Sequence, residues 1–287
     1  MTAALVDRVL PGGRVIAIDR DRAAVAAAQA RYGPAGGPVT LVVSNFSALE
    51  QVMASLHVAQ VDAVAFDLGV SSLQLDDPRR GFSIRHDGPL DMRMDQSDGV
   101  SAYDIVNGET VGELEWIVRE LGQERFARAI AHGIDRSRRR APIASTAQLR
   151  GVVEEAMPRR FWPKRIHPAT RTFQAIRILV NDELRSLELG LQAAIRILRP
   201  GGRLGVVSFH SLEDTLVKNT LHAAAQNCIC PPQQPHCTCA HRATLFVLTR
   251  KAVRPDAREL ADNPRSRSAR LRVAEKLAAS GSTQIST

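Results

Sequence analysis

The fold is decided by residues 14–69, which read RVIAIDRDRAAVAAAQARYGPAGGPVTLVVSNFSALEQVMASLHVAQVDAVAFDLG. Three short runs in this stretch are apolar on both faces, as in parallel strands that are covered on both sides. The expected strands are 14–18, 39–43 and 61–66, and the expected helices between them are 22–31 and 48–56. This alternation predicts an α/β fold with a parallel sheet and right-handed crossovers.

The strand–helix rhythm then stops for about a hundred residues. Residues 76–99 are polar and rich in glycine, which indicates a long loop, whereas residues 101–157 have the apolar spacing of helices. From Pro168 to Leu198 apolar residues recur every three or four positions, which predicts one long helix or two in series. The remaining expected elements are strands at 204–209, 244–249 and 270–274 and a helix at about 211–225.

These patterns predict a sheet domain interrupted by an all-helical insertion. We expect the sheet domain to comprise residues 1–98 and 167–276, with the insertion at 99–166 as an RNA-recognition domain. Residues 277–287 are expected to form a disordered tail.

The amino-acid composition indicates a soluble protein and favours a polyanionic partner. The 287 residues include 44% hydrophobic and 24% charged residues, as in soluble globular proteins, and no run of 18 apolar residues occurs. We therefore expect a cytoplasmic protein with no membrane contact. Lys+Arg exceed Asp+Glu by 38 − 30 = 8, which favours a polyanionic partner, while 4% aromatic residues are too few for a surface built mainly on base stacking.

Polar residues close three of the expected strands: Asp19, Asp67 and His210. In open α/β sheets, ligands bind beyond the carboxyl ends of the strands, and an acid in the position of Asp19 can accept hydrogen bonds from ribose hydroxyls. A solvated strand-end carboxylate is the alternative. The glycine-rich turn that accompanies such an acid lies about 20 residues before it. We expect the first strand and this glycine loop to precede Met1.

Five long blocks carry a resemblance. They are DLGVSSLQLDDPRRGFSIRHDGPLDMRMD (67–95), GQERFARAIAHGI (122–134), HPATRTFQAIRILVNDEL (167–184), PGGRLGVVSFHSLEDTLVK (200–218) and NPRSRSARLRVAEK (263–276). In this order they resemble the bacterial 16S ribosomal RNA cytosine-N4 methyltransferase family. The resemblance implies a Rossmann-like class I methyltransferase sheet with S-adenosylmethionine as cofactor. It also implies methylation of a decoding-centre cytidine (position 1402) of 16S rRNA, with the small ribosomal subunit as partner.

Carried over by position, the family's cofactor contacts fall on Asp19, Phe46, Asp67 and Gln74. The carboxylate of Asp19 can bind the ribose diol, and the ring of Phe46 can stack on the adenine face. The carboxylate of Asp67, together with the amide of Gln74, can bind the polar edge of adenine or the methionine ammonium. Many amino-methyltransferases accept the amine hydrogens on an Asn/Asp-Pro-Pro-aromatic turn, but residues 67–70 read Asp-Leu-Gly-Val. The catalytic residue therefore stays unassigned, and the open candidates for proton acceptor are Asp87, Asp91 and His210.

Arginines are the candidates for RNA contact. Arg171 and Arg177 lie six residues apart on the helix expected after His167, and either could instead pair with Asp182 or Glu183. Arg265 and Arg267 belong to an alternating basic segment that continues to Arg272 and could follow a phosphate backbone or form a solvated edge strand. The long loop at 76–95 is either a lid over the target pocket or a salt-linked surface loop.

Four cysteines occur within twelve residues: Cys228, Cys230, Cys237 and Cys239. With His236 and His241 nearby they could supply a tetrahedral structural zinc site, although one-residue gaps are tighter than the usual spacing. Free thiols are the alternative, and no catalytic metal is expected.

Two other functions stay open from the sequence. Without the glycine loop, the chain could be a catalytically impaired RNA-binding or ribosome-associated protein. A nicotinamide oxidoreductase shares the strand-acid pattern, but the sequence has no recognisable Tyr-Lys or His-Asp catalytic arrangement.

Overall fold

The structure is a computed structural model that describes residues 2–33, 37–231, 234 and 236–278. It divides into two compact units. Unit 1 comprises Met1–Asp19, Tyr32–Gly69 and Leu184–Thr287, and unit 2 comprises Arg20–Arg31 and Val70–Glu183. The long loop expected at 76–99 therefore belongs with the helices, so unit 2 is larger than the expected insertion at 99–166. The role of that insertion in RNA recognition stays a prediction.

Unit 1 contains the strands, and they form two sheets. β1 (Val15–Asp19) and β2 (Val39–Val43) pair in parallel. The second sheet has the order β3-β4-β6-β5, with β3 and β4 parallel and the other pairs antiparallel. Its strands are β3 (Val61–Asp67), β4 (Leu198–Ser208), β5 (Leu245–Val247) and β6 (Arg270–Lys276). The α/β class is confirmed, but the three early strands do not share one sheet, because within the described residues each of β1 and β3 pairs on one side only.

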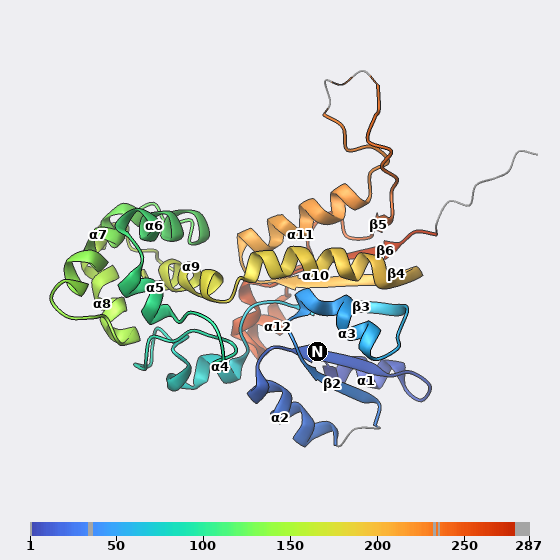
Figure 1. The fold of residues 1–287 in the computed structure, drawn as a ribbon, viewed down its shortest axis with the longest axis horizontal. Coiled ribbons are helices and arrows are strands. Elements are labelled where there is room, and N and C mark those ends of the chain that lie inside the picture. Colours follow the sequence, from blue (N-terminus) through green and yellow to red (C-terminus); the bar gives the residue numbers. More distant parts are fainter. Residues whose placement is uncertain (1, 34–36, 232–233, 235, 279–287) are drawn as a thin grey trace, which may run out of the picture. The chain divides into compact units, whose positions relative to one another are not determined.

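Helices cover this sheet because their apolar stripes match its faces. α10 (Glu183–Ile197) buries Leu187 and Leu191 in the same core as Leu204 and Val206 of β4. α10 and α11 (Ser211–Ala224) run beside the sheet (Figure 1). The other helices of unit 1 are α1 (Thr2–Val9), α3 (Leu49–Ser55) and α12 (Ala257–Asp262), of which α12 was not expected.

β4 begins six residues earlier than expected and includes Pro200, Gly201 and Gly202. The register with β3 shifts between Val61 and Ala63, so this part of the strand is irregular. Gly201 has φ = 76°, and a Cβ on Gly202 would lie 2.8 Å from a backbone oxygen. These two glycines let the chain kink without leaving the sheet.

Unit 2 is helical, as expected. Its helices are α2 (Arg22–Tyr32), α4 (Ser72–Asp76), α5 (Ala102–Gly108), α6 (Val111–Trp116), α7 (Ala127–Arg138), α8 (Thr146–Ala156) and α9 (Thr170–Val180). Capping boxes at Ser71, Ser101, Thr110 and Ser145 start four of them, since each hydroxyl and the side chain three residues later satisfy backbone N–H groups. The stripe after Pro168 is two helices, α9 and α10.

No helix in the described ranges is long and apolar enough to cross a membrane. Of the tail expected at 277–287, residues 279–287 lie outside the described residues.

Candidate functional site

The predicted strand-end carboxylates belong to unit 1. Asp19 ends β1 opposite Val43, and Asp67 ends β3 opposite Val207. Both side chains are exposed. Protein atoms nevertheless crowd the Asp67 carboxyl, and this partial desolvation raises its pKa above the ordinary value of 3.8. Each carboxylate therefore lies at the carboxyl end of a parallel strand, where α/β folds bind their ligands.

In unit 1, the residues that follow β3 lie beside the carboxyl end of β4 and the residue after it. The backbone N–H of Leu68 donates to the carbonyl of Val207 at 3.0 Å. Gly69 adopts φ = 87°, and a Cβ there would lie 3.7 Å from the ring of Phe209. Asp67 thus ends β3, and Phe209 directly follows β4 at the carboxyl ends of these two neighbouring parallel strands.

His210, a candidate proton acceptor, begins α11. Its Nδ1 accepts from the Glu213 N–H at 3.4 Å. The Glu213 carboxylate accepts in turn from the backbone N–H groups of Phe209 at 2.8 Å and His210 at 3.3 Å. The His210 Nε2 lies 3.2 Å from a Glu213 oxygen, and both side chains are buried. His210 is therefore held by the helix cap.

Phe46 lies in the turn after β2, within the short helix η1 (Phe46–Ala48) that Asn45 caps. The Asn45 amide donates to the Ser186 hydroxyl of α10 at 3.0 Å, which fixes the turn against that helix. The Phe46 ring packs edge-on against Phe66, with centroids 5.5 Å apart. A Cβ on Gly190 of α10 would come within 2.8 Å of this ring. Phe46 was predicted from the sequence, whereas Asn45, Ser186 and Gly190, which position it, were not.

Gln74 belongs to unit 2, where both polar atoms of its side-chain amide form hydrogen bonds with residues of the same unit. Its Nε2 donates to Asp21 at 2.8 Å, and its Oε1 accepts the Ser71 N–H at 2.9 Å. The same Asp21 oxygen accepts from Arg80 at 2.8 Å, and Asp21, Gln74 and Arg80 are 4%, 4% and 9% exposed. We call these three residues the Asp21 cluster. This cluster was not predicted from the sequence, and the cofactor role of Gln74 stays a prediction.

The candidate RNA-binding arginines differ in their surroundings. Arg177 is nearly buried and forms a two-pronged ion pair with Glu183, at 2.8 and 2.9 Å. Arg171 is more exposed and lies 3.7 Å from Glu124. Arg265 and Arg267 are exposed on the short helix η5 (Pro264–Ser268). Next to them in sequence, Arg270 and Arg272 both bind Asp214, at 2.8 and 2.7 Å.

The other two candidate proton acceptors, Asp87 and Asp91, accept hydrogen bonds from residues of unit 2. Asp87 accepts from the backbone N–H of Ala147 at 2.9 Å, and this contact lowers its pKa. Asp91 forms a two-pronged pair with Arg93, at 2.8 and 3.1 Å. Burial opposes ionisation of Asp91, but the hydrogen bonds from Arg93 outweigh it and lower the pKa. A lowered pKa makes both groups weak bases.

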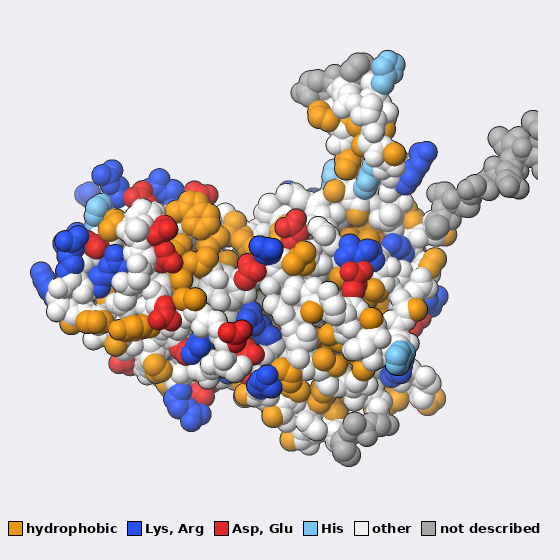
Figure 2. All heavy atoms as spheres, in the orientation of Figure 1, with side chains coloured by type: hydrophobic (Ala, Val, Ile, Leu, Met, Phe, Trp, Pro, Cys, Tyr) orange, Lys and Arg blue, Asp and Glu red, His pale blue; other side chains and the backbone are white. Residues whose placement is uncertain are grey.

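Unit 2 also carries a cluster of arginines and aromatic rings that the sequence analysis missed. Arg125 lies 4.8 Å from the ring centroid of Phe126 and 4.6 Å from that of Phe161, and Arg160 lies 4.8 Å from that of Phe161. The two rings are 5.4 Å apart, and Phe161 is 39% exposed. Figure 2 shows further basic side chains on the surface of this unit. The run Arg159-Arg160-Phe161-Trp162 was the available sequence signal.

The four cysteines meet in unit 1, on the segment between α11 and β5. All four are free, and their sulfur atoms lie within 4.8 Å of one another. Backbone N–H donors from Ile229 and His241 lower the pKa of Cys239 to about 6. His241 itself contacts the Ala223 carbonyl at 3.0 Å.

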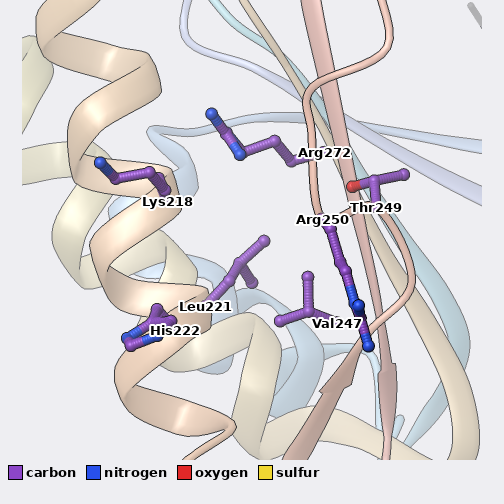
Figure 3. A pocket seen from close by; sticks show the side chains of 7 residues that line it. All are labelled: Lys218, Leu221, His222, Val247, Thr249, Arg250 and Arg272. Carbon is purple, nitrogen blue, oxygen red and sulfur yellow. The ribbon is translucent and has the colours of Figure 1, made fainter.

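A cavity of about 280 Å³ lies between α11 and the β5–β6 pair (Figure 3). Its lining is Lys218, Leu221, His222, Val247, Thr249, Arg250 and Arg272. This basic pocket contains none of the predicted cofactor residues.

Comparison with known proteins gives a consistent result. A model of the MraW methylase family matches residues 2–277. The chain is 49% identical over 267 residues to a protein from Geobacter sp. (strain M21), covering 93% of this chain and 86% of that one. It is 47% identical over 279 residues to a protein from Paenibacillus sp. (strain JDR-2), covering 95% and 88%. Both relatives are named ribosomal RNA small subunit methyltransferase H.

Proposed function

Since the chain belongs to the MraW methylase family, we propose that it methylates the N4 amine of cytidine 1402 in the decoding centre of small-subunit ribosomal RNA, with S-adenosylmethionine as donor. The observation that carries this proposal is the extent of the family match. It runs through both units, so the strand-end carboxylates and the helical unit are parts of one methylase.

The residues of unit 1 fit an adenosyl cofactor. The exposed carboxylate of Asp19 suits two ribose hydroxyls, and the half-exposed ring of Phe46, wedged between Phe66 and Gly190, suits an adenine face. The cofactor supplies an electrophilic methyl group on a sulfonium ion. The chain's own task is alignment, because in-line transfer needs the amine and the methyl in a fixed approach.

The cofactor contact that the sequence analysis predicts for Asp67 stays a prediction; we propose proton acceptance as a second role for this residue, which was not among the acceptors considered from the sequence. The cytosine amine loses a proton when it is methylated, and a nearby carboxylate of raised pKa can take it. Asp87 and Asp91 have lowered pKa values and fixed partners, and His210 caps α11. Asp67 has a raised pKa and lies at the carboxyl end of β3, opposite Val207 near the end of β4.

The arginine–aromatic cluster of unit 2 supports binding of RNA. An exposed ring bordered by guanidinium groups can stack on an unpaired base while the arginines contact phosphates. Phe161, Arg125 and Arg160 meet this description. Arg265 and Arg267 of unit 1 remain candidate phosphate contacts. Arg177, in contrast, forms an ion pair with Glu183.

Methyl transfer to small ribosomal subunits tests the proposal. The full chain is incubated with isotopically labelled S-adenosylmethionine and subunits from a strain that lacks this modification. We expect label in N4-methylcytidine after digestion of the RNA to nucleosides. Label in another nucleoside would overturn the assignment of the amine.

Calorimetric titration with S-adenosylmethionine separates the enzyme from a non-catalytic RNA-binding protein. We expect saturable binding by the wild type and weakened binding by Asp19→Asn. Tight binding of the RNA with no detectable binding of the cofactor would favour the non-catalytic role.

A further inference from the structure

The four cysteines form a compact group on an irregular segment of unit 1. Cys237 and Cys239 have their sulfur atoms 3.6 Å apart, and Cys239 and Cys228 have theirs 3.8 Å apart. A disulfide needs a separation of about 2.05 Å, so these sulfurs are not bonded to one another. All four nevertheless lie within one 4.8 Å group, although Cys228 and Cys239 are eleven residues apart.

The separations of 3.6 and 3.8 Å match the sulfur spacing around a single tetrahedral metal ion, and the other sulfur pairs lie within 4.8 Å. With a Zn–S bond of about 2.3 Å, the ligands of a tetrahedral site lie about 3.8 Å from each other. Iron–sulfur clusters bind their thiolates through different iron atoms and hold them further apart. The geometry therefore favours one metal ion over a cluster.

We propose that Cys228, Cys230, Cys237 and Cys239 bind one structural Zn²⁺ as a tetrathiolate site. Soft thiolate ligands in a closed tetrahedral set are typical of zinc sites that stabilise structure. With four protein ligands the ion has no open position, so this zinc takes no part in methyl transfer.

The surroundings of the sulfurs fit bound thiolates. The Ile229 N–H points to the Cys239 sulfur at 3.5 Å, and such donors stabilise and orient a charged ligand. Without a metal, four thiolates this close would repel one another. His241 contacts the Ala223 carbonyl, and His236 is not part of the sulfur group, so the ligand set is four sulfurs.

The zinc would hold the segment between α11 and β5. Its base is closed by the Thr244 N–H to the Ala224 carbonyl, at 2.8 Å. Beyond this base, the described residues between Ala224 and Leu245 contain no helix or strand. Loops of this length without secondary structure are uncommon in compact domains, and a metal clip that closes such a loop reduces the entropy of the unfolded chain.

Metal analysis of the untagged full chain tests the site. After dialysis, we expect about one zinc ion per chain by plasma mass spectrometry. Cys228→Ser and Cys239→Ser should lose it, and His236→Ala, the matched control, should retain it. A metal-free wild type, or cysteine variants that keep their zinc, would overturn the proposal.

Cobalt substitution in the wild type gives a second readout, which stands even where a cysteine variant fails to fold. We expect the visible and near-ultraviolet bands of a tetrahedral Co²⁺ tetrathiolate. We also expect the four thiols to react slowly with a thiol reagent until a chelator is added. Rapid reaction of all four thiols in freshly purified protein would contradict the site. Neither measurement depends on methyl transfer. The zinc site can therefore be disproved without affecting the proposed function, and the proposed function can be disproved without affecting the zinc site.

Discussion

Asp67 of unit 1 and Asp21 of unit 2 lie at or just after a strand, yet they have opposite surroundings. Asp21 is 4% exposed, and one of its oxygens accepts hydrogen bonds from both Gln74 and Arg80. Asp67 is exposed, its pKa is raised, and among the described residues no hydrogen bond to its carboxyl is found. Removing one partner of a buried ion pair leaves an uncompensated buried charge, so the fold depends on Asp21 being present beside Arg80. An exposed acid in a partly desolvated position is available to a ligand.

Substitution of Asp21 should give the largest effect. Asp21→Asn leaves the guanidinium of Arg80 buried without its anion, which costs about 3–5 kcal/mol of unfolding free energy. Both tryptophans, Trp116 and Trp162, belong to unit 2, so their fluorescence during urea unfolding reports this loss. Glu115→Gln is the control, because it removes an exposed pair with Arg119 and should cost less than about 1 kcal/mol. Equal losses of unfolding free energy in Asp21→Asn and Glu115→Gln would contradict the structural role of Asp21.

Substitution of Asp67 should impair the reaction and spare the fold. We expect Asp67→Asn to slow methyl transfer about 100-fold, equivalent to about 2.7 kcal/mol of activation free energy. Single-turnover transfer measures this loss. Asp62→Asn on the same strand, where an exposed pair with Arg199 is removed, should leave the rate unchanged.

The raised pKa of Asp67 also predicts a sign for stability. The folded state disfavours the ionised carboxylate, so this group's contribution to stability is complete below the unfolded pKa of 3.8 and is lost as pH rises through the folded value. At pH 7, Asp67→Asn should unfold at the same temperature as the wild type or at a slightly higher one. A lower unfolding temperature would assign Asp67 to the fold.

Asp214 of unit 1 should show the opposite pH dependence. Burial opposes its ionisation, but hydrogen bonds from Arg272 and Arg270 outweigh this and lower its pKa. Its contribution is therefore present above the unfolded pKa of 3.8 and is lost as pH falls through the lower folded value. Asp214→Asn should cost about 2 kcal/mol at pH 7, and thermal unfolding should show this difference shrinking in acid. A constant difference down to pH 2 would exclude the ion pair as its source.

A moderate loss of RNA affinity is expected when the ring of Phe161 is removed. Phe161→Ala removes one exposed stacking surface, which is worth about 1–3 kcal/mol per base, so affinity for the RNA should fall about tenfold. Filter binding to the small-subunit RNA measures it. Phe246→Ala removes an exposed ring from β5 of unit 1 and serves as the control. Equal losses in both variants would show that the cluster on unit 2 has no special role.

Local pattern was enough to predict much of the fold. β2 has the expected bounds, and β1 and β3 differ by one residue, because apolar runs flanked by glycine and polar residues specify short buried strands. The early start of β4 was missed, since Pro-Gly-Gly normally ends an element and only pairing with β3 keeps it in the sheet. The Asp21 cluster was also missed, because its members are 53 and 59 residues apart and no local spacing links them. For the cysteines, the sequence identified the four candidate ligands but not the distances between their sulfur atoms.

The division of the strands into two sheets has a consequence for handling the protein. β1 and β3 carry apolar residues on both faces, yet in the described chain each has one edge whose backbone groups pair with no strand. Unpaired edges of this kind attract extended segments of other molecules. Concentrated preparations are therefore expected to self-associate through backbone contacts. Light scattering should rise with concentration, and it should fall when an added charge on the exposed Ala63 or Ala65 of β3 makes that edge repulsive.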